Sequence, residues 1–502
     1  MNSSPATLDC AWLLADPGRT PARPDQQLVL EGGRIAAVTP LATPPAGRRR
    51  LVLPALANAH DHARTFRSAT LGAFGQPLES WLPYLGVIPG ADPYLCAATS
   101  FARTVRGGVA SAMVHYTRVQ GGVPYVDEAT AVARAARDVG LRIGFAVALR
   151  DRQGLAYCDD AQVLQALRPE IRAEVAARLS VRPVTPAEQL ALVDDVARAV
   201  REIGCGDHVT VQYGPTGVQW CSQPLLEAVA AASAEHDRPV HMHLLETRYQ
   251  REWADHTHPG GIVAMLVAIG LLGPRLTLAH CTWARADELA LLAERGVTIA
   301  VNTGSNLGLK SGIAPLPEML RQGCRVAMGL DGMTLDEDDD ALRELRLGYA
   351  LHRGWGFDET LSRTQLWNFG AVHGRRSVSG PQRAGTGVGG RLAPGDPADL
   401  LVLDWDGVDD DALLPDIDPL DLLLARAQAR HIEQVVIGGR TVVERGIVTG
   451  IDEPALRAEL TAQVRDRLVA QGQAAGRWRN TLDALAQDLG PFYRAGRLGG
   501  CC

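Results

Sequence analysis

The sequence predicts a (β/α)8 TIM-like barrel that carries a small β-sandwich domain built from both ends of the chain. Two observations predict the barrel: eight apolar runs typical of strands recur between residues 51 and 331, and alanine- and leucine-rich helical runs separate them. The sandwich is predicted by residues 28–40, 399–403 and 434–448, which alternate apolar side chains with turn signals such as Gly-Gly. An open doubly wound sheet is the competing fold, but no G-x-G-x-x-G or phosphate-binding loop supports it.

The eight strand candidates end in polar residues at their carboxyl ends. In chain order they are residues 51–60, 108–115, 141–150, 208–215, 238–246, 276–281, 297–303 and 325–331. A barrel gathers these ends on one face, where catalytic groups lie. We expect residues 64–92, rich in Gly, Pro and aromatic side chains, to form a long loop over that face. The mostly helical residues 159–200 are expected to form an insertion beside it.

The length of 502 residues exceeds what one ordinary core holds, so we expect several parts. Four are predicted: residues 1–53 as the first part of the β-sandwich, 54–377 as a metal-dependent hydrolase barrel, 378–450 as the second part of the sandwich, and 451–502 as a helical extension.

The composition is that of a soluble globular protein, with 46% hydrophobic and 21% charged residues. A net charge of −7 without a basic stripe argues against a nucleic-acid partner. No apolar run is long enough to span a bilayer, and the start has no basic region of a signal peptide. Nine cysteines without a C-x-x-C pair fit reduced thiols, so we expect a cytoplasmic protein with no membrane partner. A homo-oligomer stays an open alternative to a monomer.

The stretch A-N-A-H-D-H-A-R-T carries two histidines on alternate positions of a strand, so both imidazoles face the same way. Such a pair suits a divalent transition metal, although a polar patch at a strand end explains it equally well on its own. More polar groups follow at the same end of strands five, six and eight. The full set is His60, His62, His243, Glu246, His280 and Asp331. A barrel would bring all of them to one point, which favours a functional site.

These residues lie in longer motifs. The motifs are P-A-L-A-N-A-H-D-H, H-L-L-E, L-A-H-C-T-W, N-T-G-S-N-L-G-L-K-S-G-I-A-P and G-L-D-G, with L-E-G-G-R-I-A-A-V, G-D-P-A-D-L-L-V-L-D and V-V-I-G-G-R-T-V-V-E-R-G at the ends. With these motifs, nearly the whole chain resembles the amidohydrolase superfamily, and most closely its branch of cytosine/guanine deaminases and triazine hydrolases. The three end motifs look like the flanking β-sandwich of that superfamily.

The resemblance implies a single divalent metal, Zn²⁺ or Fe²⁺, bound by three histidines and one aspartate. The implied ligands are His60, His62, His243 and Asp331. It further implies that His280 orients the attacking water and that Glu246 carries the proton between water and substrate. The chemistry is consistent, because a divalent ion lowers the pKa of bound water from 15.7 towards about 7 and a carboxylate nearby can move the proton.

The only lysine in the chain, Lys310, bears on the number of metals. Binuclear members of the superfamily commonly bridge two ions with a carboxylated lysine on strand four. Strand four here reads H-V-T-V-Q-Y-G-P and contains none, so we expect one metal ion.

Four further residues are candidates for contact with substrate. Arg64 follows the histidine pair and could pair with a substrate carboxylate or brace a loop. His115 ends strand two, and a structural role is equally open for it. Gln212 and Trp220 follow or end strand four and are candidates by position alone. His241 should lie one layer deeper than His243 and is interpreted as a hydrogen-bonded core residue.

Three function hypotheses follow. The first is hydrolysis of a carbon–nitrogen bond other than a peptide bond, in which an aminated N-heterocycle is deaminated and ammonia is released. The second is hydrolysis at another leaving group, such as an amide, an alkylamine, or a halide on a triazine-like ring. The third, a non-catalytic binding or assembly module, is disfavoured because no predicted ligand is missing. The acidic residues 336–340 either favour the start of the following helix or form a rim that attracts cationic substrates.

Overall fold

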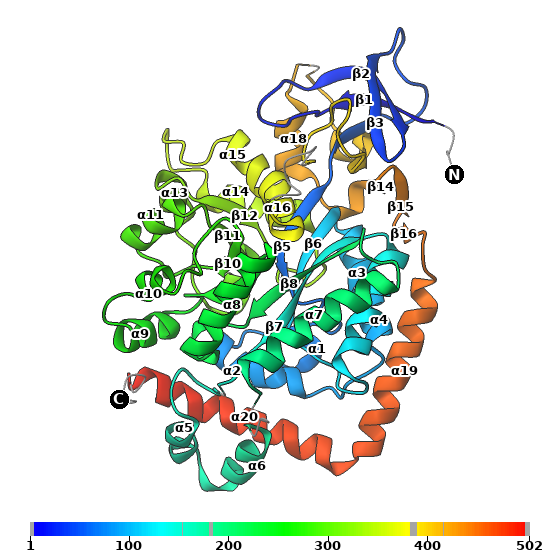
Figure 1. The fold of residues 1–502 in the computed structure, drawn as a ribbon. Coiled ribbons are helices and arrows are strands. Elements are labelled where there is room, and N and C mark those ends of the chain that lie inside the picture. Colours follow the sequence, from blue (N-terminus) through cyan, green and yellow to red (C-terminus); the bar gives the residue numbers. More distant parts are fainter. Residues whose placement is uncertain (1–4, 153, 180–183, 382–388, 415, 497–502) are drawn as a thin grey trace.

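The computed structural model describes residues 5–152, 154–179, 184–381, 389–414 and 416–496. It contains two sheets of eight strands each, one in the middle of the chain and one built from both termini. Figure 1 shows the sheet from the termini at one end of the molecule and a group of helices at the other, with the barrel between them. The predicted fold class is thereby confirmed, whereas the exact four-part division of the chain stays a prediction.

The central sheet is a barrel of parallel strands. They are β5 (Leu56–Asp61), β6 (Val109–Tyr116), β7 (Arg142–Leu149), β8 (Val209–Pro215), β9 (Val240–Leu244), β10 (Leu276–His280), β11 (Thr298–Val301) and β12 (Arg325–Met328). Each pairs in parallel with the next in chain order. The Asp331 amide donates to the His60 carbonyl at 2.9 Å and so joins the last strand to the first. Both faces of these strands are mostly buried, which explains their nearly continuous apolar sequences.

Helices alternate with the barrel strands. They are α3 (Pro93–Arg106), α4 (Tyr125–Val139), α7 (Pro186–Glu202), α8 (Gln223–His236), α9 (Arg248–Thr257), α10 (Ile262–Ala268), α11 (Ala286–Glu294), α12 (Thr303–Gly308), α13 (Leu316–Arg321), α14 (Ala341–His352), α15 (Arg363–Trp367) and α16 (His373–Ser379). Local sequence sets several of their starts. At α7, for example, Thr185 and Glu188 form a reciprocal capping box ahead of an amphipathic stretch.

The second sheet joins both ends of the chain in the order β16-β15-β14-β13-β4-β1-β2-β3. Its strands are β1 (Ala6–Leu13), β2 (Arg23–Glu31), β3 (Arg34–Pro40), β4 (Arg50–Pro54), β13 (Leu400–Asp404), β14 (Ile432–Ile437), β15 (Arg440–Glu444) and β16 (Ile447–Val448). The predicted strand 51–60 is therefore divided, because its first half pairs in this sheet and only its second half enters the barrel. The division follows Pro54, which has no N–H to donate to a ladder.

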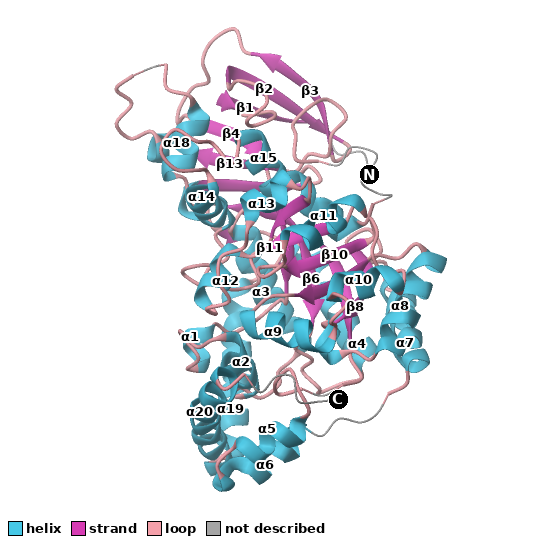
Figure 2. Ribbon diagram, turned by 90° about the vertical axis from the view of Figure 1, so that its left-hand side faces the viewer, coloured by secondary structure: helices cyan, strands magenta, loops and turns pink. Residues whose placement is uncertain are grey.

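Helices from distant parts of the chain gather at the carboxyl ends of the barrel strands (Figures 1 and 2). They are α1 (Ser68–Leu71), α2 (Leu78–Trp81), α5 (Asp160–Ala166), α6 (Pro169–Leu179) and α20 (Gln473–Arg494). The helix before α20, α19 (Glu453–Gln471), packs against α3 along the side of the barrel. Arg168 donates to Asp488 in bonds that include two of 2.7 and 2.8 Å, and the Thr481 hydroxyl donates to Glu174 at 2.6 Å; these bonds join α20 to the α5–α6 segment. Of the predicted insertion 159–200, α5 and α6 project in this way, whereas α7 joins the ring of barrel helices.

No helix within the described parts of the chain is both long and apolar enough to cross a membrane.

Candidate metal centre

The end of β5 presents two imidazoles to the interior of the barrel. His60 lies in the strand and His62 follows it, and both are buried. Between them, the Asp61 carboxylate accepts hydrogen bonds from the amides of His62 (2.7 Å) and Ala63 (2.9 Å). It also accepts from the Gly332 amide at 3.2 Å. Asp61 therefore fixes the turn after the strand.

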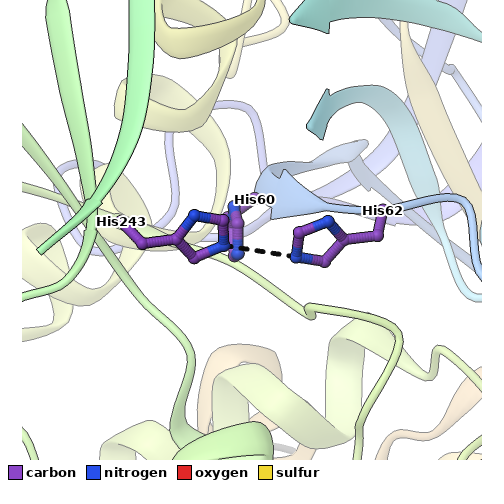
Figure 3. A group of neighbouring side chains, drawn as sticks. All are labelled: His60, His62 and His243. Atoms are coloured by element: carbon purple, nitrogen blue, oxygen red, sulfur yellow. Dashed lines mark hydrogen bonds between the residues drawn. The ribbon is translucent and has the colours of Figure 1, made fainter. Parts of the chain in front are cut away.

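The imidazoles of His60, His62 and His243 meet at one point, from β5 and β9 (Figure 3). His62 Nε2 lies 3.3 Å from His243 Nε2. The Asp331 carboxylate, which follows β12, completes the cluster, with Oδ1 at 3.3 Å from His62 Nε2 and 3.5 Å from His60 Nε2. His60 belongs to two groups that could each hold an ion, one with His62 and His243 and one with His280 and Asp331, and together these groups contain the four side chains that the sequence singles out as ligands.

The donor set fits a divalent transition metal. Both ring nitrogens of His60 are buried without a hydrogen-bond partner, and a buried polar atom of this kind needs one. A metal ion bound by His60 would satisfy one of these nitrogens. Three imidazoles with one carboxylate are ligands that suit zinc.

Hydrogen bonds to backbone carbonyls orient two of these rings. His62 Nδ1 lies 2.7 Å from the His115 carbonyl, and His243 Nδ1 lies 2.7 Å from the Thr216 carbonyl. A ring whose Nδ1–H donates to a carbonyl keeps a lone pair on Nε2, which is the nitrogen that faces the cluster. The two rings are therefore held in the tautomer that a metal needs.

Glu246 and His280 lie beside the cluster. The Glu246 Oε2 is 3.5 Å from His280 Nε2, and the other ring nitrogen of His280 is 2.9 Å from Asn306 Oδ1. Burial raises the pKa of Glu246 to about 7, and the charges of Asp331 and Glu79 add to this effect. The carboxyl group can therefore exchange a proton near neutral pH.

Asp331 is held in its ionised form. Burial by itself would raise its pKa, but Arg64 and His62 outweigh burial and lower the pKa below its ordinary value. Arg64 Nη1 lies 3.0 Å from Asp331 Oδ1, and the Ser305 hydroxyl donates to Oδ2 at 2.5 Å. The Arg64 guanidinium also stacks on Trp81, 4.7 Å from the ring centroid. Arg64 thus pairs with a candidate ligand, a contact that differs from both expected roles, the binding of a substrate carboxylate and the bracing of a loop.

The turns at this face have unusual backbone angles. Leu245, His280 and Asp331 all have positive φ values, of 51°, 73° and 56°. Residues other than glycine rarely adopt this conformation, which costs about 1–3 kcal/mol and concentrates at functional sites. The strain lies where the chain directs Glu246, His280 and Asp331 toward the cluster.

These groups open into a cavity of about 500 Å³. Of the predicted site residues, those in its wall are His62, Arg64, Trp220, His243, Glu246, His280 and Asp331. The rest of the wall comes from the segment around α2, from the residues that follow β6, β7, β8 and α12, and from α6 and α20. The predicted loop over the mouth accordingly contributes to the pocket, although it contains short helices.

Two predicted substrate residues lie elsewhere. Gln212 donates from its amide to the carbonyls of Ser377 and Val378, at 2.8 and 3.0 Å, and is fully buried outside the cavity. The position of Gln212 in the predicted strand four suggested that it contacts the pocket, but its side chain faces α16. His115 is also fully buried, with Nδ1 at 3.2 Å from His241 Nδ1. The structure thus gives His115 a structural place, together with the expected core residue His241.

Among the arginines and tryptophans that line the pocket, the sequence interpretation missed Arg150, Arg178 and Trp478. Arg150 follows β7 at the carboxyl end of a predicted strand, which is a signal that could have identified it. Arg178 lies on α6 and Trp478 on α20, 300 residues apart in the sequence, and no local pattern links them.

The acidic residues 336–340 serve the structure locally. Asp340 caps α14 by accepting from the Arg343 amide at 3.0 Å and also accepts from the Ala429 amide at 2.9 Å. Asp339 is buried and accepts from Arg103 and Thr104, at 3.2 and 3.0 Å. This favours the helix-start interpretation over an acidic rim for cationic substrates.

Comparison with known proteins gives a match to the model of the amidohydrolase family over residues 51–442. The chain is similar to 5'-deoxyadenosine deaminase from Methanothermobacter thermautotrophicus, with 26% identity over 86% of this chain and 94% of the relative. It is also similar to 8-oxoguanine deaminase from Pseudomonas aeruginosa, with 28% identity over 89% of this chain and 95% of the relative.

Among solved structures, an adenosine deaminase from Xanthomonas campestris with bound zinc superposes with a TM-score of 0.71 and 22% identity, covering 92% of this chain and 98% of that one. Atrazine chlorohydrolase from Arthrobacter aurescens, complexed with zinc, gives a TM-score of 0.66 and 23% identity, covering 91% of this chain and 98% of that one. Because these two structures are only 22% and 23% identical to this chain, the similarity shows a shared fold and nothing more.

Proposed function

The chain belongs to the amidohydrolase family, and from that premise we propose that it deaminates an aminated N-heterocycle by hydrolysis, with one divalent metal ion, most simply Zn²⁺. The observation that carries the proposal is the placement of Glu246 and His280 beside the four candidate ligands, at the wall of one cavity. The two relatives compared over nearly their whole length are both named as deaminases, which supports an amino leaving group.

In this proposal His60, His62, His243 and Asp331 hold the metal. Bound there, a divalent ion supplies a water molecule whose pKa falls from 15.7 towards about 7, which provides a nucleophile at neutral pH. Arg64 keeps Asp331 anionic, and the carbonyls behind His62 and His243 keep their Nε2 atoms turned to the cluster.

In this proposal Glu246 carries out the proton transfers. Its carboxylate takes a proton from water, and the oxygen adds to the ring carbon that carries the amino group. Glu246 then gives this proton to the departing amine, or gives it to the ring nitrogen while the remaining proton of the added hydroxyl passes to the amine; by either route ammonia leaves and the carbon keeps the oxygen. His280, held by Asn306, orients the water for this attack.

A cytoplasmic location is part of the proposal. Cys10, Cys96 and Cys221 are buried free thiols, which fits a reducing compartment. The partner is a small-molecule substrate.

The test is an ammonia-release screen of the zinc-loaded protein over aminopyrimidines, purines, pterins and triazines. We expect ammonia from at least one class and none from the Glu246→Gln variant. Release of chloride or alkylamine from triazines, with no ammonia from any compound, would instead favour the alternative leaving groups. If no compound releases ammonia, chloride or alkylamine, the result would favour the non-catalytic hypothesis.

A further inference from the structure

The cavity extends from the metal cluster to the helices that cover the barrel. Its volume of about 500 Å³ lies within the range of about 300–1,000 Å³ that is typical of pockets for drug-sized ligands. Val175 and Arg178 of α6 and Trp478 and Leu485 of α20 form its outer wall. The catalytic groups therefore occupy one part of a larger site, and a substituent on the heterocycle would contact the outer wall.

Among the described residues, the charged side chains that line this cavity are mostly cationic. They are Arg64, Arg150 and Arg178, against the carboxylates of Glu246 and Asp331. Arg64 is already paired with Asp331 at 3.0 Å, and a divalent ion held by the cluster would add two positive charges. Because low-dielectric walls focus the field of such groups, the cavity favours anions.

The outer cations are held against aromatic rings. The Arg178 guanidinium lies 3.7 Å from the centroid of Trp478, and the Arg150 guanidinium lies 5.9 Å from the centroid of Trp220. A stacked guanidinium keeps its N–H groups directed in its own plane, where they can bind a carboxylate or phosphate by two parallel bonds. Arg178 lies 3.9 Å from the Glu174 carboxylate, which is a long contact between two partly exposed side chains.

We propose that the substrate carries an anionic group, a carboxylate or a phosphate, on a substituent distant from the reacting carbon, and that Arg178, stacked on Trp478, binds it together with Arg150. The proposal rests on the proposed function, since it names the substrate class of the same site. It also gives the C-terminal extension a role, because α20 supplies the ring on which Arg178 is placed.

Binding to the zinc-loaded Glu246→Gln protein, which should not turn substrate over, provides the test. Calorimetry compares adenosine with adenosine 5'-phosphate, and pterin with pterin-6-carboxylate. We expect the anionic member of at least one pair to bind at least about tenfold more tightly, the size of one charge-assisted hydrogen bond. A preference within the adenosine pair would indicate a phosphate, and a preference within the pterin pair would indicate a carboxylate.

A second substitution separates Arg178 from the metal, which also attracts anions. Adding Arg178→Gln should reduce the preference for the anionic member by about tenfold, and Arg178→Lys should restore part of it. The matched control is Arg198→Gln on α7, a residue paired with Asp195 away from the cavity, which changes the net charge equally and should leave the preference intact.

Equal or weaker binding of the anionic member in both pairs would overturn the proposal, as would a preference that Arg178→Gln leaves unchanged. Ammonia release from the neutral members by the unmodified protein tests the proposed function separately. Deamination of neutral compounds without an anionic preference would therefore refute only the present inference.

Discussion

A buried carboxylate, Asp399, joins the sheet from the termini to the barrel and gives the most quantitative prediction. It lies just before β13, and its side chain is 1% exposed. It accepts from Arg142 at the start of β7 and from Arg375 in α16, each at 2.6 Å, and from the Gly438 amide at 2.7 Å. Replacing it by asparagine should therefore loosen the contact between the two sheets.

The size of the effect follows from the electrostatics. Burial by itself would raise the pKa of Asp399, but the two guanidinium groups and the backbone amide outweigh it and lower the pKa from 3.8 to about 2. A difference of nearly two pKa units is worth about 2 kcal/mol of folding free energy. Asp399→Asn also leaves two cations without their anion, and breaking a buried pair in this way costs about 3–5 kcal/mol.

The pH dependence has a definite sign. Because the pKa is lower in the folded state, the stabilisation is fully present above the ordinary pKa of 3.8 and is lost as the pH falls through about 2. Thermal unfolding of the wild-type protein and of Asp399→Asn should therefore differ most at pH 7, and the gap should narrow between pH 4 and pH 2. Asp406→Asn is the control, since that carboxylate is 46% exposed and its pair with Arg49 should contribute within about 1 kcal/mol. Equal stability at pH 7, or a gap that widens in acid, would refute the reasoning.

Three further predictions concern single side chains. Glu246→Gln should lower kcat by about 100- to 10,000-fold while zinc content stays constant; an equal loss of metal would assign Glu246 to the ligands. Asp340→Ala removes the cap of α14 and should lower the free energy of unfolding by about 1 kcal/mol in thermal scans, whereas Asp340→Asn should retain most of it. Glu79→Ala takes the acceptor from the buried hydroxyls of Thr247 and Tyr157, at 2.6 and 2.9 Å, and should cost about 1–3 kcal/mol; an unchanged melting temperature would contradict this network.

Much of the fold could be predicted because strands and helices of a barrel have distinct local patterns. Continuous apolar runs such as residues 141–150 reveal buried parallel strands, and the barrel then orders them by chain sequence alone. The stretch 51–60 shows the limit of this reasoning. Its apolar pattern continues across Pro54, although the two halves pair in different sheets.

The site was predictable to the extent that strand ends define it. His60, His243 and Asp331 each end or follow a strand at the same face, so their convergence follows from the barrel. Gln212 differs, because it lies three residues before the end of β8 and its side chain faces α16 and not the cavity. Arg178 and Trp478 meet only through the packing of α6 near α20, a tertiary contact that no sequence period encodes.

The most direct test of the account is the metal content of the purified protein after zinc loading and dialysis, measured beside the His62→Ala and Glu246→Gln variants. The account predicts one zinc ion per chain in the wild-type protein and in Glu246→Gln, and a loss of zinc in His62→Ala. No retained metal in the wild-type protein, or two ions per chain, or equal retention by His62→Ala, would contradict it.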